Sequence, residues 1–255
     1  MYSVEDIENL IEKWAPKSLC CEGDNVGLLV GRKNADVKGV LVAFEVTSDI
    51  IDEAIEKGAN LIVCHHPLIF YPLLNRVTDC EYVQGLVLRL IENHISLIAA
   101  HTNLDWAENG VTQTLAENLG IEIIDNLKEN EGVYGNIEPR TLMDFANDVK
   151  DELSCPHLKY VGENQKLIKT VAVVSGGGGD YIKYALEHGC DAFVSADFKY
   201  HQAHMAYEND IAIIDAGHFE TENIILSKVY DYLCDNTNGV HIFLSSRNKS
   251  FYKYI

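Results

Sequence analysis

Two segments of the chain, residues 38–66 and residues 169–197, overlay on each other without a gap. Each begins with a run rich in β-branched residues, continues into a helix-like stretch and ends in a second apolar run. The glycines that would end the two helices, Gly58 and Gly189, coincide in this overlay. An overlay of this length indicates an internal duplication of a β-α-β unit. Because strands and helices alternate in both copies, we expect two similar α/β lobes, each with a mostly parallel sheet.

The rest of the chain is expected to complete these lobes. We assign residues 1–126 to the first lobe, with residues 225–255 as a candidate completion of it, and residues 127–224 to the second lobe. Further helices are expected at about residues 3–14, 81–94, 110–118 and 141–153. Residues 121–140 are rich in Asp, Asn, Glu and Gly, and we expect them to form a connection.

Composition and charge limit the classes of function. With 255 residues, 47% of them hydrophobic, the chain can bury a sizeable core. A formal net charge of −19 opposes binding to nucleic acid, whose backbone needs concentrated Lys and Arg. The apolar runs are too short for a membrane span, and the acidic first residues do not resemble a signal peptide. Seven scattered cysteines indicate a reducing compartment, so we expect a cytoplasmic protein.

Metal-ligating side chains follow three of the predicted strands. The apolar run that ends at Cys64 stops at a pair of histidines, and comparable polar segments follow two later strands. In parallel α/β sheets, ligands bind beyond the carboxyl ends of the strands, so these side chains are expected to gather. The residues in question are His65, His66, His101, Asp105, His218 and Glu222.

A metal site explains this set better than structural histidines do. A histidine in a fold is more often a satisfied core residue than a ligand, and the pair His65 and His66 alone would leave the question open. Asp105, His218 and Glu222 at equivalent strand ends favour a metal site. Mixed imidazole and carboxylate ligands suit zinc, manganese, iron or cobalt better than calcium. Without His101, the set comprises three histidines and two carboxylates. Five protein ligands exceed the number that one catalytic metal usually takes, so two ions that share a carboxylate fit better.

Two further features of the second lobe have alternative interpretations. The glycine-rich segment from Ser175 to Asp180 follows a strand and precedes a helix, which suits a phosphate-binding turn. It matches neither the Walker nor the dinucleotide spacing, so a tight structural turn is the favoured interpretation. Asp197 coincides with His66 in the overlay, and we expect it to point towards the same site from the other lobe.

Motifs along nearly the whole chain resemble the Nif-three-like family, whose members are often labelled GTP cyclohydrolase I type 2 homologues. The motifs are GDNVGLLVG, VCHHPLIF, AAHTNLD, SGGGGD, ADFKYH and DAGHFETE. The resemblance implies two similar α/β lobes with a dinuclear metal site in the cleft between them. It also implies a ring-shaped homohexamer. The positions that match the family's metal ligands are His65, His66, Asp105, His218 and Glu222.

The ligand set and the resemblance together predict a metal-dependent hydrolase with two divalent ions per chain. Its substrate is expected to be a nucleotide or a related phosphate-containing small molecule, and the family label implies chemistry like that of GTP cyclohydrolase. His101 or Glu45 is expected to transfer the proton. The alternative is a protein without enzymatic activity, namely a metal-binding scaffold, a metal carrier or a protein-interaction adaptor.

Overall fold

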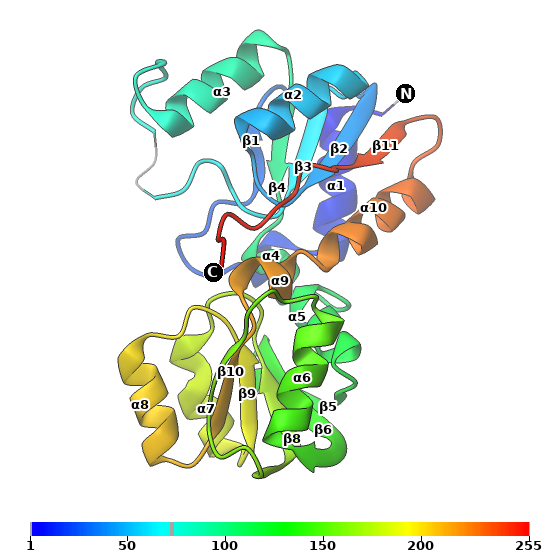
Figure 1. Cartoon of the computed structure of the whole chain (residues 1–255). Coiled ribbons are helices and arrows are strands. Elements are labelled where there is room, and N and C mark those ends of the chain that lie inside the picture. The colour runs from blue at the N-terminus through cyan, green and yellow to red at the C-terminus, as the bar shows by residue number, and fades with distance from the viewer. Residues whose placement is uncertain (1, 72–73, 255) are drawn as a thin grey trace. The chain divides into compact units, whose positions relative to one another are not determined.

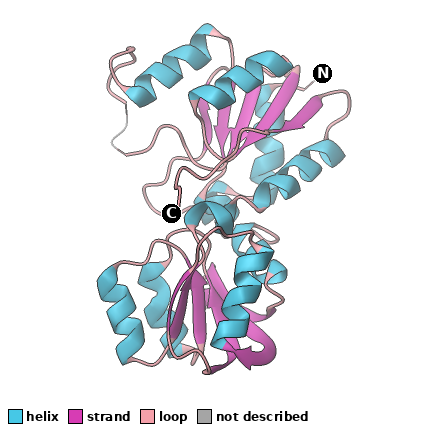
Figure 2. Ribbon diagram, in the orientation of Figure 1, coloured by secondary structure: helices cyan, strands magenta, loops and turns pink. Residues whose placement is uncertain are grey.

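The computed structural model describes residues 2–71 and 74–254. Their strands form one sheet of five strands and another of six, and helices pack on both sheets (Figure 1, Figure 2). The chain therefore has a mixed α/β fold, as the alternation of strand-like and helix-like segments predicts. Within the described residues, no helix is long and apolar enough to cross a membrane.

The contacts within the chain divide it into two compact units. The first unit comprises the chain up to Glu108 together with Ile225–Lys249. The second comprises Asn109–Ile224 together with the segment that starts at Ser250. Residues 109–126 thus belong to the second unit, whereas the sequence pattern leads us to expect them in the first lobe.

The first unit is built on a largely parallel sheet. Its helices are α1 (Val4–Trp14), α2 (Ser48–Lys57), α3 (Tyr82–Glu92), α4 (Thr102–Asp105) and α10 (Ile225–Asn236). Its strands are β1 (Gly27–Val30), β2 (Gly39–Ala43), β3 (Leu61–Cys64), β4 (Ser96–Ala99) and β11 (His241–Leu244). In the strand order β1-β4-β3-β2-β11, β1 is antiparallel to β4 and the other neighbouring strands are parallel.

Both faces of this sheet are buried. Helices α2 and α3 pack on one face, in a core that contains Leu41, Ile62 and Leu97. Helices α1 and α10 cover the opposite face (Figure 1), and Trp14 of α1 packs against Tyr232 of α10. Continuous burial on both faces explains why β2, β3 and β4 appear in the sequence as unbroken apolar runs without a polar alternation.

Local signals set the ends of the helices. Ser3 and Asp6 form a capping box at the start of α1, in which each side chain accepts the backbone N–H of the other residue. At the start of α2 the bond runs one way only, since the Thr47 hydroxyl accepts the backbone N–H of Ile50 (3.3 Å). Gly58 ends α2 with φ 68°, a left-handed conformation that glycine adopts without a steric penalty.

The second unit has a sheet with a parallel centre. Its helices are α5 (Val111–Asn118), α6 (Leu142–Glu152), α7 (Ile182–Glu187), α8 (Tyr200–Glu208) and α9 (His218–Glu222). Its strands are β5 (Glu122–Lys128), β6 (Glu131–Thr141), β7 (Lys159–Val161), β8 (Leu167–Val173), β9 (Ala192–Ser195) and β10 (Ala212–Asp215). The order is β5-β6-β8-β9-β10-β7, with β8, β9 and β10 parallel and the other strands antiparallel to their neighbours. The sheet is thus less uniformly parallel than expected.

The prediction that residues 121–140 form a connection is wrong, because this segment forms the hairpin of β5 and β6. Much of β5 is exposed, so it has no apolar run that would reveal a strand. In β6, Gly135 lies so close to the backbone of β5 that a methyl group there would overlap the carbonyl of Glu122. The glycines and polar residues that resembled a loop therefore belong to a strand pair at the edge of the sheet.

Glu53 of α2 anchors the segment that follows β11. Its carboxylate is buried and accepts hydrogen bonds from the Ser245 hydroxyl (2.5 Å), the Ser246 N–H (3.0 Å) and the Ser246 hydroxyl (2.9 Å). Burial raises the pKa of Glu53, but these bonds outweigh it and hold the pKa below its ordinary value of 4.5. The carboxylate therefore stabilises the fold at neutral pH.

We predict that Glu53→Ala lowers the free energy of unfolding by about 3 kcal/mol at pH 7, because two serines lose their buried acceptor. Urea denaturation checks the value, and Glu92→Ala on the exposed end of α3 is the control, with an expected change below about 0.5 kcal/mol. Since the folded-state pKa is lowered, the contribution is complete above pH 4.5 and is lost as the pH falls through the folded pKa. A loss equal to that of the control would contradict the anchoring role.

Candidate metal centre

The histidine pair lies directly after strand β3 of the first unit. The backbone N–H groups of His65 and His66 both donate to the carbonyl of Phe44, at 3.1 Å and 2.9 Å. The two imidazole rings lie 5.1 Å apart, centroid to centroid, and the Phe44 ring packs against both. Alternating strand geometry would send two consecutive side chains to opposite faces, so the end of the strand is what allows these rings to lie together.

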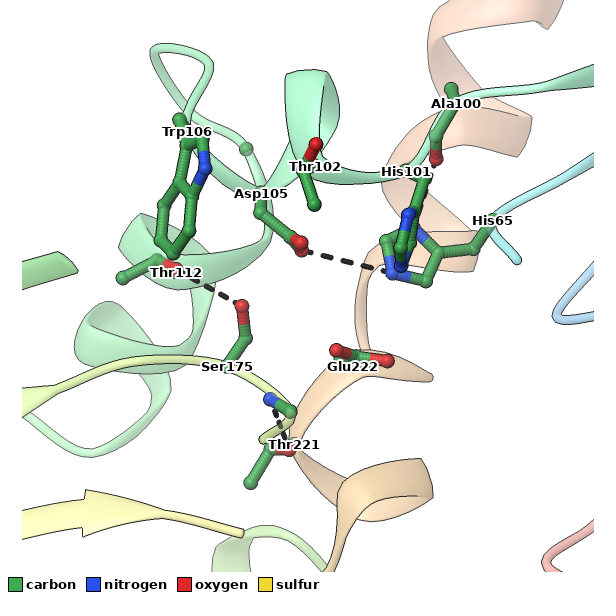
Figure 3. A network of polar contacts seen from close by, with 12 residues as sticks. His65, Ala100, His101, Thr102, Asp105, Trp106, Thr112, Ser175, Thr221 and Glu222 are labelled. Atoms are coloured by element: carbon green, nitrogen blue, oxygen red, sulfur yellow. Dashed lines mark hydrogen bonds and ion pairs between the residues drawn. The ribbon is translucent and has the colours of Figure 1, made fainter. Parts of the chain in front are cut away.

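Strand β4 ends beside β3 and positions the next two polar residues. His101 is the N-cap residue of α4, and its carbonyl accepts the N–H of Asp105 (2.9 Å). This turn of helix places Oδ1 of Asp105 3.7 Å from Nε2 of His65 (Figure 3). The side chains of Asp105 and His65 are both buried. The structure thus brings together the predicted residues of the first unit that follow β3 and β4.

A backbone acceptor orients the ring of His65. Its Nδ1 lies 2.9 Å from the carbonyl oxygen of Ala100, and a carbonyl oxygen can only accept a hydrogen bond. In the neutral ring, Nδ1 therefore carries the proton and Nε2 keeps its lone pair, which is the form in which an imidazole binds a metal. One ring nitrogen from each of His65, His66 and His101 lies within 4.8 Å of the other two. The first unit alone thus contains a group of three imidazoles.

Asp24 joins this group, although the sequence analysis did not single it out. Both of its carboxylate oxygens lie 3.0 Å from Nδ1 of His101, and the carboxylate also accepts the backbone N–H of Thr102 (3.1 Å). Burial raises the pKa of Asp24, but the bonds from His101 and Thr102 outweigh it and hold the pKa well below its ordinary value. Asp24 lies within the GDNVGLLVG motif, which is the only signal that the sequence offers for it.

Glu45, the other predicted proton-transfer residue, lies just beyond strand β2 and is half-buried. It is not a member of the three-imidazole group. Its charge acts on Cys64, where burial is the main cause that raises the thiol pKa and Glu45 adds to it.

In the second unit, His218 and Glu222 lie on the short helix α9, which follows strand β10. Nε2 of His218 lies 3.1 Å from Oε2 of Glu222, as expected for residues one helical turn apart. Nδ1 of His218 lies 2.7 Å from the carboxylate of Asp197. Asp197 adopts a left-handed conformation (φ 56°) just beyond β9. Asp197 therefore contacts His218, a predicted metal ligand of the same unit.

The two carboxylates change the charge of His218. Burial lowers the pKa of this imidazole, but its bonds to Asp197 and Glu222 outweigh burial and raise the pKa to about 10. In the metal-free chain, His218 is therefore protonated at neutral pH. A metal ion that takes Nε2 must displace this proton, because only the deprotonated nitrogen is a ligand.

The glycine-rich turn packs directly against this pair. Gly176 has φ 59°, and a methyl group on it would overlap Oε1 of Glu222 and lie 3.2 Å from Nε2 of His218. Its N–H donates to the hydroxyl of Thr221 (3.1 Å; Figure 3). The absence of a side chain at this position thus leaves room for the carboxylate and the imidazole.

The same turn argues against phosphate binding by its backbone. The N–H of Gly176 is bound to Thr221, and the N–H of Gly178 donates to the hydroxyl of Ser195 (2.8 Å). Ser175 in turn contacts the hydroxyl of Thr112 at 3.0 Å (Figure 3). Side chains of the chain itself use these groups, which favours the interpretation as a structural turn.

The donor set fits divalent transition metals. Each unit contains an imidazole with a carboxylate close to it, namely Asp105 beside His65 and Glu222 beside His218. Imidazole with carboxylate is a usual ligand combination for zinc, manganese, iron and cobalt. An oxygen acceptor at Nδ1 of a ligating histidine is equally usual, and both His65 and His218 have one.

We predict that Gly176→Ala weakens metal binding at least tenfold, because the added methyl group displaces Glu222. The left-handed backbone adds a loss of stability of about 1 kcal/mol. Gly177→Ala is the matched control, since its methyl group would meet nothing closer than 3.7 Å and the backbone is not left-handed there. Zinc titration against a competing chelator checks both variants, and equal affinities in the two would refute the packing argument.

We also predict that zinc binding at pH 7.5 releases a proton from His218, whose pKa is raised to about 10. Calorimetric titration in two buffers with different ionisation enthalpies counts the protons released. The count should fall by about one in His218→Ala and remain unchanged in His204→Ala, an exposed histidine of α8. An unchanged count in His218→Ala would show that this imidazole does not exchange its proton for the metal.

Comparisons with known proteins identify the family. The family model of Duf34/NIF3 (NGG1p interacting factor 3) matches residues 2–250. A Clostridium acetobutylicum protein named GTP cyclohydrolase 1 type 2 homolog is 34% identical over 264 residues, which cover 98% of each chain. The crystal structure of Staphylococcus aureus protein SA1388 superimposes with a TM-score of 0.90 at 29% identity and covers 100% of this chain and 99% of that one. Reduced HcgD from Methanocaldococcus jannaschii has a TM-score of 0.83 at 30% identity, with 95% and 97% covered. The chain therefore belongs to the Duf34/NIF3 family.

Proposed function

We propose that this chain is a metal-dependent hydrolase that acts on a nucleotide or a related phosphate-containing small molecule. Two divalent metal ions per chain would be held by His65, His66, Asp105, His218 and Glu222. The observation that carries the proposal is the geometry of His65 and His218, each of which has an oxygen acceptor at Nδ1 and a carboxylate near Nε2. Such paired arrangements are typical of metal ligands and exceed what a structural histidine needs.

The proposed reaction class rests on this ligand set and on the name of a relative. When bound, divalent ions would polarise a substrate oxygen and make a water molecule more acidic. His101 would accept the proton of the attacking water, because its ring lies beside those of the predicted ligands His65 and His66; Glu45 remains the alternative acceptor. The name of the Clostridium acetobutylicum relative, GTP cyclohydrolase 1 type 2 homolog, supports a purine nucleotide as the first substrate to test.

Four further properties of the chain are predictions from the sequence and its family resemblance. They are the internal duplication, the placement of the metal site, the homohexameric ring and the location in the cytoplasm. Static light scattering of the purified chain checks the ring, for which we expect a mass of about six chains. The net charge of −19 continues to argue against nucleic acid as a partner.

We predict two bound metal ions per chain in the wild type and turnover of GTP or a generic phosphodiester with added Mn²⁺ or Zn²⁺. His66→Ala and Glu222→Ala should each weaken metal binding at least tenfold and abolish turnover, because each removes a predicted ligand. His204→Ala is the control with unchanged metal content and turnover. Elemental analysis and a phosphate-release and ring-opening assay provide the two measurements.

The outcomes separate the candidate functions. Two metal ions with turnover that both ligand variants abolish support the hydrolase. Two metal ions without turnover of any nucleotide or phosphoester would support a metal carrier or scaffold instead. Fewer than one metal ion per chain would refute the ligand assignment itself.

A further inference from the structure

Asp24 makes a set of contacts that the metal site does not require. Its side chain is only 3% exposed, yet it lies in a loop before the first strand rather than at a strand end. Besides His101 and the N–H of Thr102, it accepts the hydroxyl of Thr102, and the N–H of Asn25 donates to Oδ1 (2.7 Å). The Thr102 hydroxyl in turn accepts the N–H of Cys21 (2.9 Å). The bonds from Asn25 and Thr102 thus hold the carboxylate in position independently of its bond to the imidazole of His101.

This carboxylate determines the state of the His101 ring. A carboxylate can only accept, so in the neutral ring Nδ1 of His101 carries the proton and Nε2 keeps its lone pair. Nδ1 faces Asp24, and the rings of His65 and His66 lie 5.3 Å and 5.5 Å from the ring of His101, centroid to centroid. Both ring contacts are edge-on, so the ring plane is held as well as the tautomer.

His101 differs from the predicted ligand beside it in its access to solvent. The side chain of His101 is 19% exposed, whereas that of His65 is fully buried. A group that transfers a proton needs a path to water, and the exposed part of the His101 side chain provides one. A neutral imidazole that takes up a proton at Nε2 also needs a nearby negative charge to stabilise the resulting cation, and Asp24 provides it.

We propose that Asp24 is a positioning residue, which fixes the Nδ1–H tautomer and the orientation of His101 so that Nε2 is the nitrogen that accepts a proton. The proposal deepens the hydrolase function proposed above and rests on it for its catalytic meaning. Its structural part, the tautomer, stands independently of any activity.

The tautomer is measured directly by long-range ¹H–¹⁵N correlation spectra of the ¹⁵N-labelled full-length chain, without metal and loaded with zinc. Loss of one ring signal in His101→Gln assigns the residue. We expect His101 to be protonated at Nδ1 in the wild type and to shift towards the Nε2–H form in Asp24→Asn. Glu22→Gln, an exposed carboxyl group in the same loop, is the matched control with an unchanged tautomer.

Kinetics and metal content distinguish a positioning role from a structural one. With a substrate that the wild type hydrolyses, Asp24→Asn should lower kcat by a factor of about 10²–10⁴ with two metal ions still bound. His101→Gln should lower kcat similarly, and the double variant should lose no more than His101→Gln alone, because the two residues act as one unit.

Three results would overturn the proposal. One is an Nδ1–H tautomer that persists in Asp24→Asn. Another is the loss of a metal ion in His101→Gln, which would make His101 a ligand. The third is a loss of activity in Asp24→Asn that only matches a loss of folded protein, as judged by amide spectra and thermal unfolding. A wild type without metal or turnover would refute the proposed function instead, and the tautomer measurement would remain valid.

Discussion

The hydrogen bond at Nδ1 decides what each histidine of the candidate site can do. His65 donates to a backbone carbonyl, His101 to Asp24 and His218 to Asp197. Because none of these oxygens can donate, each neutral ring must present Nε2 as its lone-pair nitrogen. The metal binding and the proton transfer that we propose at Nε2 would both depend on this constraint. The proposed chemistry would therefore depend on the packing that holds each oxygen in place as well as on the imidazole.

The sheets explain how such constraints arise twice in one chain. In the first unit, parallel strands β2, β3 and β4 end at one edge, and the residues just beyond them include His65, His66 and His101. In the second unit, β8, β9 and β10 are likewise parallel, and Gly176, Asp197 and His218 follow them. The carboxyl ends of parallel strands are a general location for ligand sites, since the chain must turn there and its side chains need not pack in the core.

Much of the fold and of the candidate site could be predicted from the sequence. Buried parallel strands leave apolar runs, and the polar residues that interrupt them, such as His65 and His218, are conspicuous. Strand β5 of the hairpin could not be recognised, because most of its residues are exposed and they do not alternate between apolar and polar. Asp24 was missed for a different reason. It lies 77 residues from His101 in the chain, so only the folded structure shows that it controls this ring, and the contact of Asp197 with His218 likewise depends on a left-handed turn.

The central claim is that imidazoles from both units bind metal. Anomalous diffraction from crystals of the zinc-loaded chain, recorded at the zinc absorption edge, tests it most directly. We expect zinc peaks about 2.0–2.1 Å from Nε2 of His65 and of His218, with Asp105 and Glu222 among the neighbouring ligands. Zinc peaks found only at cysteines or at exposed acidic side chains, with none at these imidazoles, would contradict the account.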